Sequence, residues 1–154
     1  MAIFGDADVS LIQKSLSNDE NNNADGGIIL HEGVSYMFLS QNGLRFDNIA
    51  DFIMDKVNDL SEFNPQTFVI HQRTSPEVIL GDHVIDIYKN SVWNALHLLK
   101  KLFPKHDLVF STVCVTDTAY LNGSQMSLSD SGCKVLFEKI HNQLCNEWRY
   151  IPPF

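Results

Sequence analysis

Ala2-Ile3-Phe4-Gly5-Asp6-Ala7-Asp8-Val9 is the stretch that decides the fold. Its apolar run ends at Gly5, and from Val9 onward the apolar residues Ile12 and Leu16 recur at helical spacing. A short apolar run is typical of a buried strand, and the spacing behind it predicts a helix. A strand that leads directly into a helix indicates an α/β fold.

The same pattern recurs along the chain. Apolar runs separated by helices with one apolar stripe favour a mostly parallel sheet of four or five strands in a three-layer α/β/α arrangement. The polar segment 17–27 is predicted to be a flexible loop. Further strands are expected at 28–31, 68–71 and 108–115, with the start of a fifth at 150–151, and helices at 47–60, 86–103 and 130–148.

Length and charge limit the function classes. The 154 residues fit one domain, 1–154, and the 44% hydrophobic content can supply a core. The net charge of -8 disfavours nucleic acid as a partner. A basic cluster on or near the long predicted helix is expected to be a solvated face; it consists of Lys89, Lys100, Lys101, Lys105 and His106.

The cysteines and the apolar segments indicate a cytoplasmic protein. Cys114, Cys133 and Cys145 lack the spacing of a metal or redox site and are expected to be buried, reduced thiols. The N-terminus has no basic region followed by a long apolar stretch, and no run approaches membrane-spanning length. The sequence therefore predicts no membrane partner.

Two motifs and the order of elements carry a family resemblance. Phe4-Gly5-Asp6-Ala7 ends the first strand, and Phe68-Val69-Ile70-His71-Gln72-Arg73-Thr74-Ser75 ends a later one. They resemble the Gly-Asp-Ser and Gly-Thr-Asn-Asp signatures of the SGNH (GDSL) hydrolase superfamily. The following loop, long helix, Pro104 and apolar strand match that family's plan, so the resemblance implies a flavodoxin-like SGNH-type fold over nearly the whole chain.

The resemblance also implies that catalysis has been lost. The family's serine nucleophile corresponds to Ala7, and its oxyanion glycine and asparagine correspond to Arg73 and Ser75. No Asp-x-x-His element precedes Phe154, so the C-terminal catalytic block is expected to be missing. The positions that match the family's site are Asp6, Ala7, Gly33, Arg73, Thr74 and Ser75.

Substitute groups do not restore the missing chemistry. Ser10 lies about one helical turn past the strand end, and Asp8 has no identifiable base or oxyanion partner in the sequence. His31 and His71 both end predicted strands at the carboxyl edge of the sheet, where such sheets bind ligands, which makes them candidate proton-transfer groups. The remaining histidines lack carboxylate–histidine spacing, so no metal and no cofactor are predicted.

A phosphatase is a second enzyme hypothesis. Asp6-Ala7-Asp8-Val9-Ser10 and Gly81-Asp82-His83-Val84-Ile85-Asp86 resemble motifs with which haloacid-dehalogenase-type phosphatases hold magnesium beside a nucleophilic aspartate. The short spacing between them argues against this hypothesis. Asp82 and Asp86 are better explained as the polar start of the long helix.

A catalytically inactive SGNH-like binding module is therefore the leading hypothesis, and a weakly active or divergent esterase is the alternative. The loop Arg73-Thr74-Ser75, or the helix face carrying Lys89 and Lys100, would contact a protein, with RNA less favoured. Such sequences are also similar to the esterase-like segments of retrotransposon reading frames. A second copy of the chain could cover the sheet edge after Tyr150, giving a homo-oligomer.

Overall fold

The central strand of the sheet is β1 (Ala2–Gly5), which is buried along its whole length. It pairs in parallel with β4 (Val34–Ser40) on one side and with β5 (Thr67–Arg73) on the other. β6 (Asp107–Val113) extends the parallel pairing beyond β5. The α/β sheet predicted from the alternating strands and helices is confirmed.

Two further strands turn the sheet antiparallel at its other edge. β3 (Ile28–His31) forms a hairpin with β4, and β2 (Asn23–Asp25) pairs with β3, both antiparallel. The order is β2-β3-β4-β1-β5-β6, so six strands form the sheet once the short β2 is counted. Its four parallel strands follow the order 2-1-3-4 in chain sequence, as at the start of flavodoxin-like sheets.

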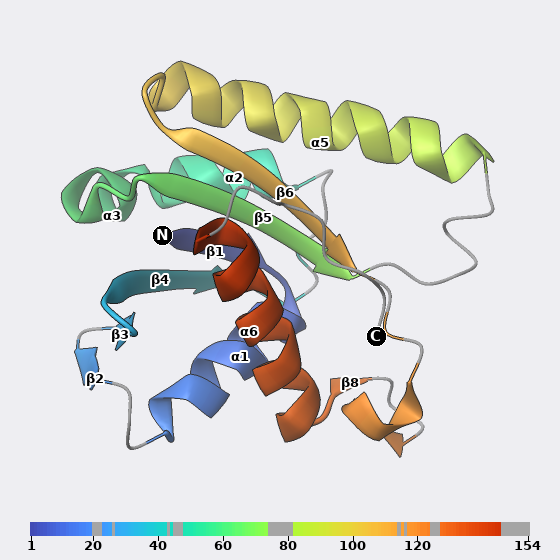
Figure 1. Ribbon diagram of the computed structural model, residues 1–154. Coiled ribbons are helices and arrows are strands. Elements are labelled where there is room, and N and C mark those ends of the chain that lie inside the picture. Colours follow the sequence, from blue (N-terminus) through green and yellow to red (C-terminus); the bar gives the residue numbers. More distant parts are fainter. Residues whose placement is uncertain are drawn as a thin grey trace.

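Helices cover both faces of this sheet (Figure 1). α1 (Ala7–Ser17) and α6 (Asp130–Cys145) lie on one face. On the other face lie α2 (Ile49–Asp55), α3 (Val57–Phe63) and α5 (Asp82–Leu102). The result is three layers, α/β/α.

Strand alternation divides the interior into two cores. Ile3 and Val69 face α1 and α6, whereas their neighbours Phe4 and Phe68 face α2 and α5. The rings of Phe4 and Phe68 stack with centroids 6.1 Å apart. Because successive side chains of a strand point to opposite faces, each buried strand contributes to both cores.

The computed structural model describes residues 1–19, 23–25, 27–42, 44, 48–73, 82–113, 115, 117–123 and 127–145. Side chains at 23–25, 72–73, 82–89, 91–92, 110, 112–113 and 143–145 lie outside the description. So do Cys114 and the predicted fifth strand at 150–151. Cys133 is a buried thiol, as expected.

Several predicted boundaries change. The segment 17–27 contains β2, and the strand β4 was not predicted. The helix expected at 47–60 is two helices, α2 and α3, that meet at Lys56. α5 begins four residues earlier than expected, at Asp82.

A short hairpin leads from the sheet into α6. The 3-10 helix η1 (Thr118–Tyr120) precedes β7 (Leu121–Asn122), which pairs antiparallel with β8 (Ser127–Leu128). Among the helices of the described ranges, none has the length and apolarity needed to cross a membrane.

The close approach of α1 to β5 gives the first prediction. A Cβ at Gly5 would lie 2.9 Å from the backbone oxygen of His71 and would overlap the side chain of Val9. Gly5→Ala should therefore lower the free energy of unfolding by about 1–3 kcal/mol, the usual cost of overpacking. Urea denaturation measures this change. Ser10→Ala, at an exposed position of the same helix, is the control and should have a much smaller effect.

Candidate functional site

A histidine and a serine meet where β5 and β6 approach their carboxyl ends. His71 and Ser111 are register partners on these neighbouring strands. Both follow the alternation of Val69 and Val109, so they face the α1 and α6 layer. His71 Nδ1 lies 3.0 Å from Ser111 Oγ, a hydrogen-bonding distance.

The first turn of α1 brings a carboxylate to the same histidine. Asp6 caps the helix by accepting a hydrogen bond from the backbone N–H of Asp8 at 3.3 Å. Asp8 Oδ2 then lies 3.9 Å from His71 Nε2. From the sequence, Asp8 had no identifiable base as a partner. The structure corrects this expectation, because His71 lies beside Asp8.

Asp8, His71 and Ser111 form a carboxylate–imidazole–hydroxyl set, which we call the Asp8–His71–Ser111 set. In serine hydrolases such a set activates the hydroxyl when one ring nitrogen faces it and the other faces the carboxylate. The order of groups is the same here, but the ring nitrogens are exchanged, since Nδ1 faces the hydroxyl and Nε2 faces the carboxylate. The 3.9 Å distance to the carboxylate also exceeds a hydrogen bond. Within the described residues, His71 Nε2 makes no hydrogen bond.

Burial limits what this set can do. The side chain of His71 is 0% exposed and that of Asp8 is 4% exposed. Ser111 is buried as well. A nucleophile must reach the reacting carbonyl of its substrate, and in this conformation Ser111 is not accessible to one. The set therefore acts as a polar contact between the sheet and α1.

The positions considered for the nucleophile and the oxyanion hole differ in where they lie. Ala7 is exposed at the start of α1, directly beyond β1, and Ser10 is exposed one turn later. Arg73 is the last residue of β5, and its side chain lies outside the description. Thr74 and Ser75 lie outside the described residues.

Gly33 and His31 do not lie at this edge of the sheet, so their predicted placement was wrong. β3 runs antiparallel to β4, and the two are joined by the turn Glu32-Gly33 at the amino end of β4. Since β4 is parallel to β1, that turn lies at the opposite end from Ala7. A strand's direction, which the apolar run does not reveal, decides which edge its last residue occupies.

A second group of polar side chains gathers around this turn. The ligand atoms of His31, Glu32 and His141 all lie within 4.8 Å of one another. Sequence spacing missed this group because His141 is 109 residues from Glu32. The described residues could hold a metal ion here, although the sequence predicted none.

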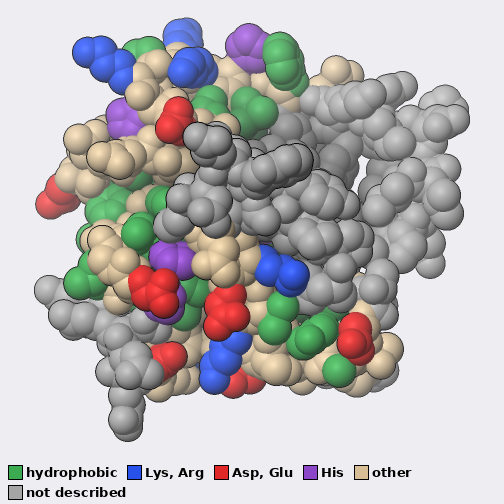
Figure 2. Space-filling view, viewed as in Figure 1, with side chains coloured by type: hydrophobic (Ala, Val, Ile, Leu, Met, Phe, Trp, Pro, Cys, Tyr) green, Lys and Arg blue, Asp and Glu red, His purple; other side chains and the backbone are tan. Residues whose placement is uncertain are grey.

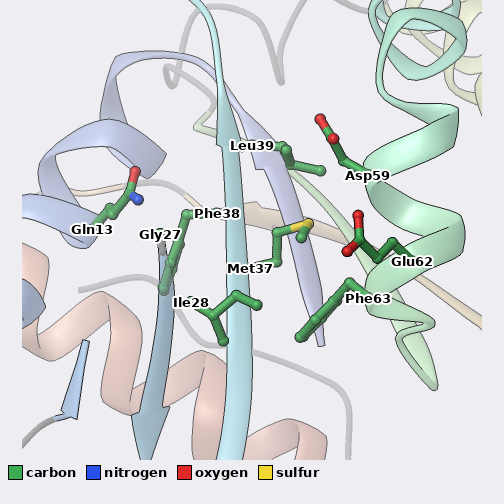
Figure 3. Close-up of a pocket in the computed structure, with 9 residues that line it drawn as sticks. All are labelled: Gln13, Gly27, Ile28, Met37, Phe38, Leu39, Asp59, Glu62 and Phe63. Atoms are coloured by element: carbon green, nitrogen blue, oxygen red, sulfur yellow. The ribbon is translucent and has the colours of Figure 1, made fainter. Parts of the chain in front are cut away.

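A pocket of about 630 Å³ lies away from the Asp8–His71–Ser111 set. Figure 3 shows Asp59, Glu62 and Phe63 projecting from α3 toward Met37 and Leu39 of β4. The pocket thus has apolar walls and two carboxylates on one side. The sequence did not predict it because the pocket depends on how α3 lies across β4.

The described residues provide no distances that test the phosphatase hypothesis. Asp82 begins α5, as expected for an acidic residue at a helix start. The side chains of Asp82 and Asp86 lie outside the description, as does Gly81. A magnesium site shared with Asp6 and Asp8 therefore stays a prediction.

Comparison with protein-family models found no match, and neither did comparison with curated proteins or with solved structures.

The second prediction concerns the role of the Asp8–His71–Ser111 set in stability. Ser111→Ala removes the hydroxyl that His71 Nδ1 contacts and leaves a buried ring nitrogen without that partner. The free energy of unfolding should fall by about 1–3 kcal/mol. Urea denaturation with Ser61→Ala, at an exposed position of α3, is the matched comparison. Equal stability of the two variants would contradict a structural role for the contact.

Proposed function

We propose that this chain is a non-catalytic, SGNH-hydrolase-like α/β module that binds another protein. The observation that carries the proposal is Ala7, which stands directly beyond β1 where the resembled family places its serine nucleophile. Its methyl group has no atom that could attack a carbonyl. Acyl transfer by the family's usual route therefore lacks its first step.

Two features support the SGNH-like part of the proposal. Gly5 and Asp6 occupy the turn from β1 into α1, which is where the family's signature residues are expected. The parallel strands β4-β1-β5-β6 have the 2-1-3-4 order of a flavodoxin-like sheet. Fold alone does not specify activity, so the proposal depends on the residues at the strand ends.

A divergent hydrolase is the second candidate, and the Asp8–His71–Ser111 set favours it. The hydroxyl and the carboxylate face different nitrogens of one imidazole, as general-base activation of a serine requires. Against this candidate stand the 0% exposure of His71 and the 3.9 Å distance to Asp8. Ser111 would become a nucleophile only if a rearrangement exposed its hydroxyl to the substrate.

Hydrolysis of p-nitrophenyl acetate separates the two candidates. The folded chain should release nitrophenolate no faster than an equal concentration of heat-denatured chain, because the hydroxyl of Ser111 and the imidazole of His71 are both buried. Ser111→Ala should leave that rate unchanged. A folded-state rate that disappears in Ser111→Ala but persists in Ser61→Ala would overturn the non-catalytic proposal and support the divergent hydrolase.

The outer face of α5 supplies a binding surface of defined chemistry. Trp93 is 63% exposed, and its ring contacts that of His97 with centroids 4.8 Å apart. Lys100 and Lys101 are exposed on the same side, one to two turns later. We call Trp93, His97, Lys100 and Lys101 the α5 basic face; Figure 2 shows Lys side chains gathered near a His and hydrophobic side chains at this end of the molecule.

Charge complementarity selects the partner of this face. The chain carries a net charge of -8, so a cluster of lysines is a local exception to its overall field. The overall field repels any polyanion, and it repels RNA most because RNA carries a phosphate at every nucleotide. A short acidic protein segment carries fewer charges, and it can lie along the lysines and bury Trp93. An acidic segment of another protein is the partner that we assign to the α5 basic face.

The third prediction tests this partner with a fluorescein-labelled oligoglutamate peptide, followed by anisotropy. Lys100→Glu/Lys101→Glu should weaken binding by about 10-fold or more, because a reversed charge faces the peptide. The affinity should also fall as salt is added.

The control double variant is Lys14→Glu/Lys134→Glu, which changes the net charge equally but lies on α1 and α6. It should bind the peptide with nearly the original affinity. Equal losses of peptide affinity in the two double variants would show that binding depends only on net charge, and would contradict the assignment of the α5 basic face as the binding surface. Tighter binding of an RNA oligonucleotide than of the peptide would also contradict the assigned partner.

A further inference from the structure

The turn between β3 and β4 brings two histidines and a glutamate together at the amino end of the sheet. His141 Nε2 lies 2.9 Å from Glu32 Oε2. The rings of His31 and His141 are edge to face, with centroids 5.0 Å apart. All three ligand atoms lie within 4.8 Å of one another.

Each side chain reaches this place for a separate reason. His31 shares a sheet face with Ile29 by strand alternation, and this face meets α6. His141 lies one turn beyond Phe137 on the buried stripe of α6. Glu32 precedes Gly33 in a two-residue turn in which both residues have positive φ, 47° and 79°.

The conformation of Glu32 is unusual for its residue type. Two-residue turns with positive φ at both positions are dominated by Asn, Asp and Gly, because other side chains are strained there. Glu32 adopts this conformation and reaches His141 with its longer side chain. Asparagine or glycine would adopt the positive φ of this position at least as readily, but neither has a side chain long enough to reach the ring of His141.

We propose that His31, Glu32 and His141 bind a divalent transition-metal ion, with Zn²⁺ as the best fit. Two imidazoles and a carboxylate are a ligand set that Zn²⁺ accepts, and three protein ligands leave a fourth position for water. Tetrahedral bonds of about 2.0–2.1 Å separate neighbouring ligand atoms by about 3.3 Å. The observed separations, 2.9 Å for one pair and at most 4.8 Å for the others, are comparable with this spacing.

Tyr36 holds the ring of His141, the buried ligand, through a hydrogen bond to its other ring nitrogen. His141 Nδ1 is hydrogen-bonded to the hydroxyl of Tyr36, which is fully buried. Metal-binding histidines usually donate their other ring N–H to such a partner, which fixes the ring and its tautomer. When Nε2 binds the ion, the remaining imidazole proton resides on Nδ1 and is donated to the Tyr36 hydroxyl oxygen.

The surroundings give an ion access from solvent. The side chain of Glu32 is 70% exposed, that of His141 only 7%, and His31 is half-buried. Figure 2 shows His and acidic side chains adjoining one another on the surface between β3 and the end of α6. A bound ion would connect α6 to a hairpin 109 residues away in the chain. This site is separate from the α5 basic face and does not depend on the proposed function.

The fourth prediction is that the chain binds Zn²⁺, measured by competition with a chromophoric chelator. Absorption of the Co²⁺-loaded chain reports on coordination. His31→Ala and Glu32→Gln should each weaken binding by at least about 10-fold, since loss of an outer partner alone costs about 10–100-fold. Tyr36→Phe should weaken it by about 10-fold.

The controls are His97→Ala and Glu62→Gln, which remove an exposed histidine and an exposed glutamate elsewhere. Both should bind Zn²⁺ as the unaltered chain does. Circular dichroism confirms that each variant is folded; His141→Ala is not used because its side chain lies in the core. Absence of Zn²⁺ binding, unchanged affinity in His31→Ala and Glu32→Gln, or loss of binding in His97→Ala would each overturn the proposed site.

Discussion

The arrangement of this protein depends on the contact between α1 and the end of the sheet at Gly5. With no side chain there, the side chain of Val9 and the backbone oxygen of His71 can both lie close to Gly5, and the helix can begin directly beyond β1. That close approach carries Asp8 to His71, on the face of the sheet where α1 also packs against α6. A larger residue at this position would separate the helix from the sheet. It would disturb both the Asp8–His71–Ser111 set and the core between the sheet and α1 and α6.

The sequence predicts the elements that have a complete local signal. β1, β5 and β6 are short apolar runs, and the apolar stripes of α5 and α6 repeat at helical spacing. β4 was missed because the turn before it uses Glu32, a residue rarely found at positive φ. β2 is a strand only through its pairing with β3, and a polar segment does not specify its partner.

The polar sites were harder to predict because they depend on strand direction and register. Alternation alone places His71 and Ser111 on defined faces, but only the register of β5 and β6 makes them neighbours. His31 ends an apolar run much as His71 does, yet the antiparallel direction of β3 moves it to the other end of the sheet. Its approach to His141 depends on how α6 packs, which no spacing in the sequence records.

The length of β4 determines how far apart two groups of side chains lie: the Asp8–His71–Ser111 set, and the group formed by His31, Glu32 and His141. The strand runs from Val34, beside the turn, to Ser40, beside β1's carboxyl end, which is about 20 Å at about 3.3 Å per residue. Groups this far apart contribute additively to stability. A double substitution, with one change in each group, should therefore lower the free energy of unfolding by the sum of the two single effects. Any difference from that sum would be the coupling free energy between the groups, transmitted through the packing of α1 and α6.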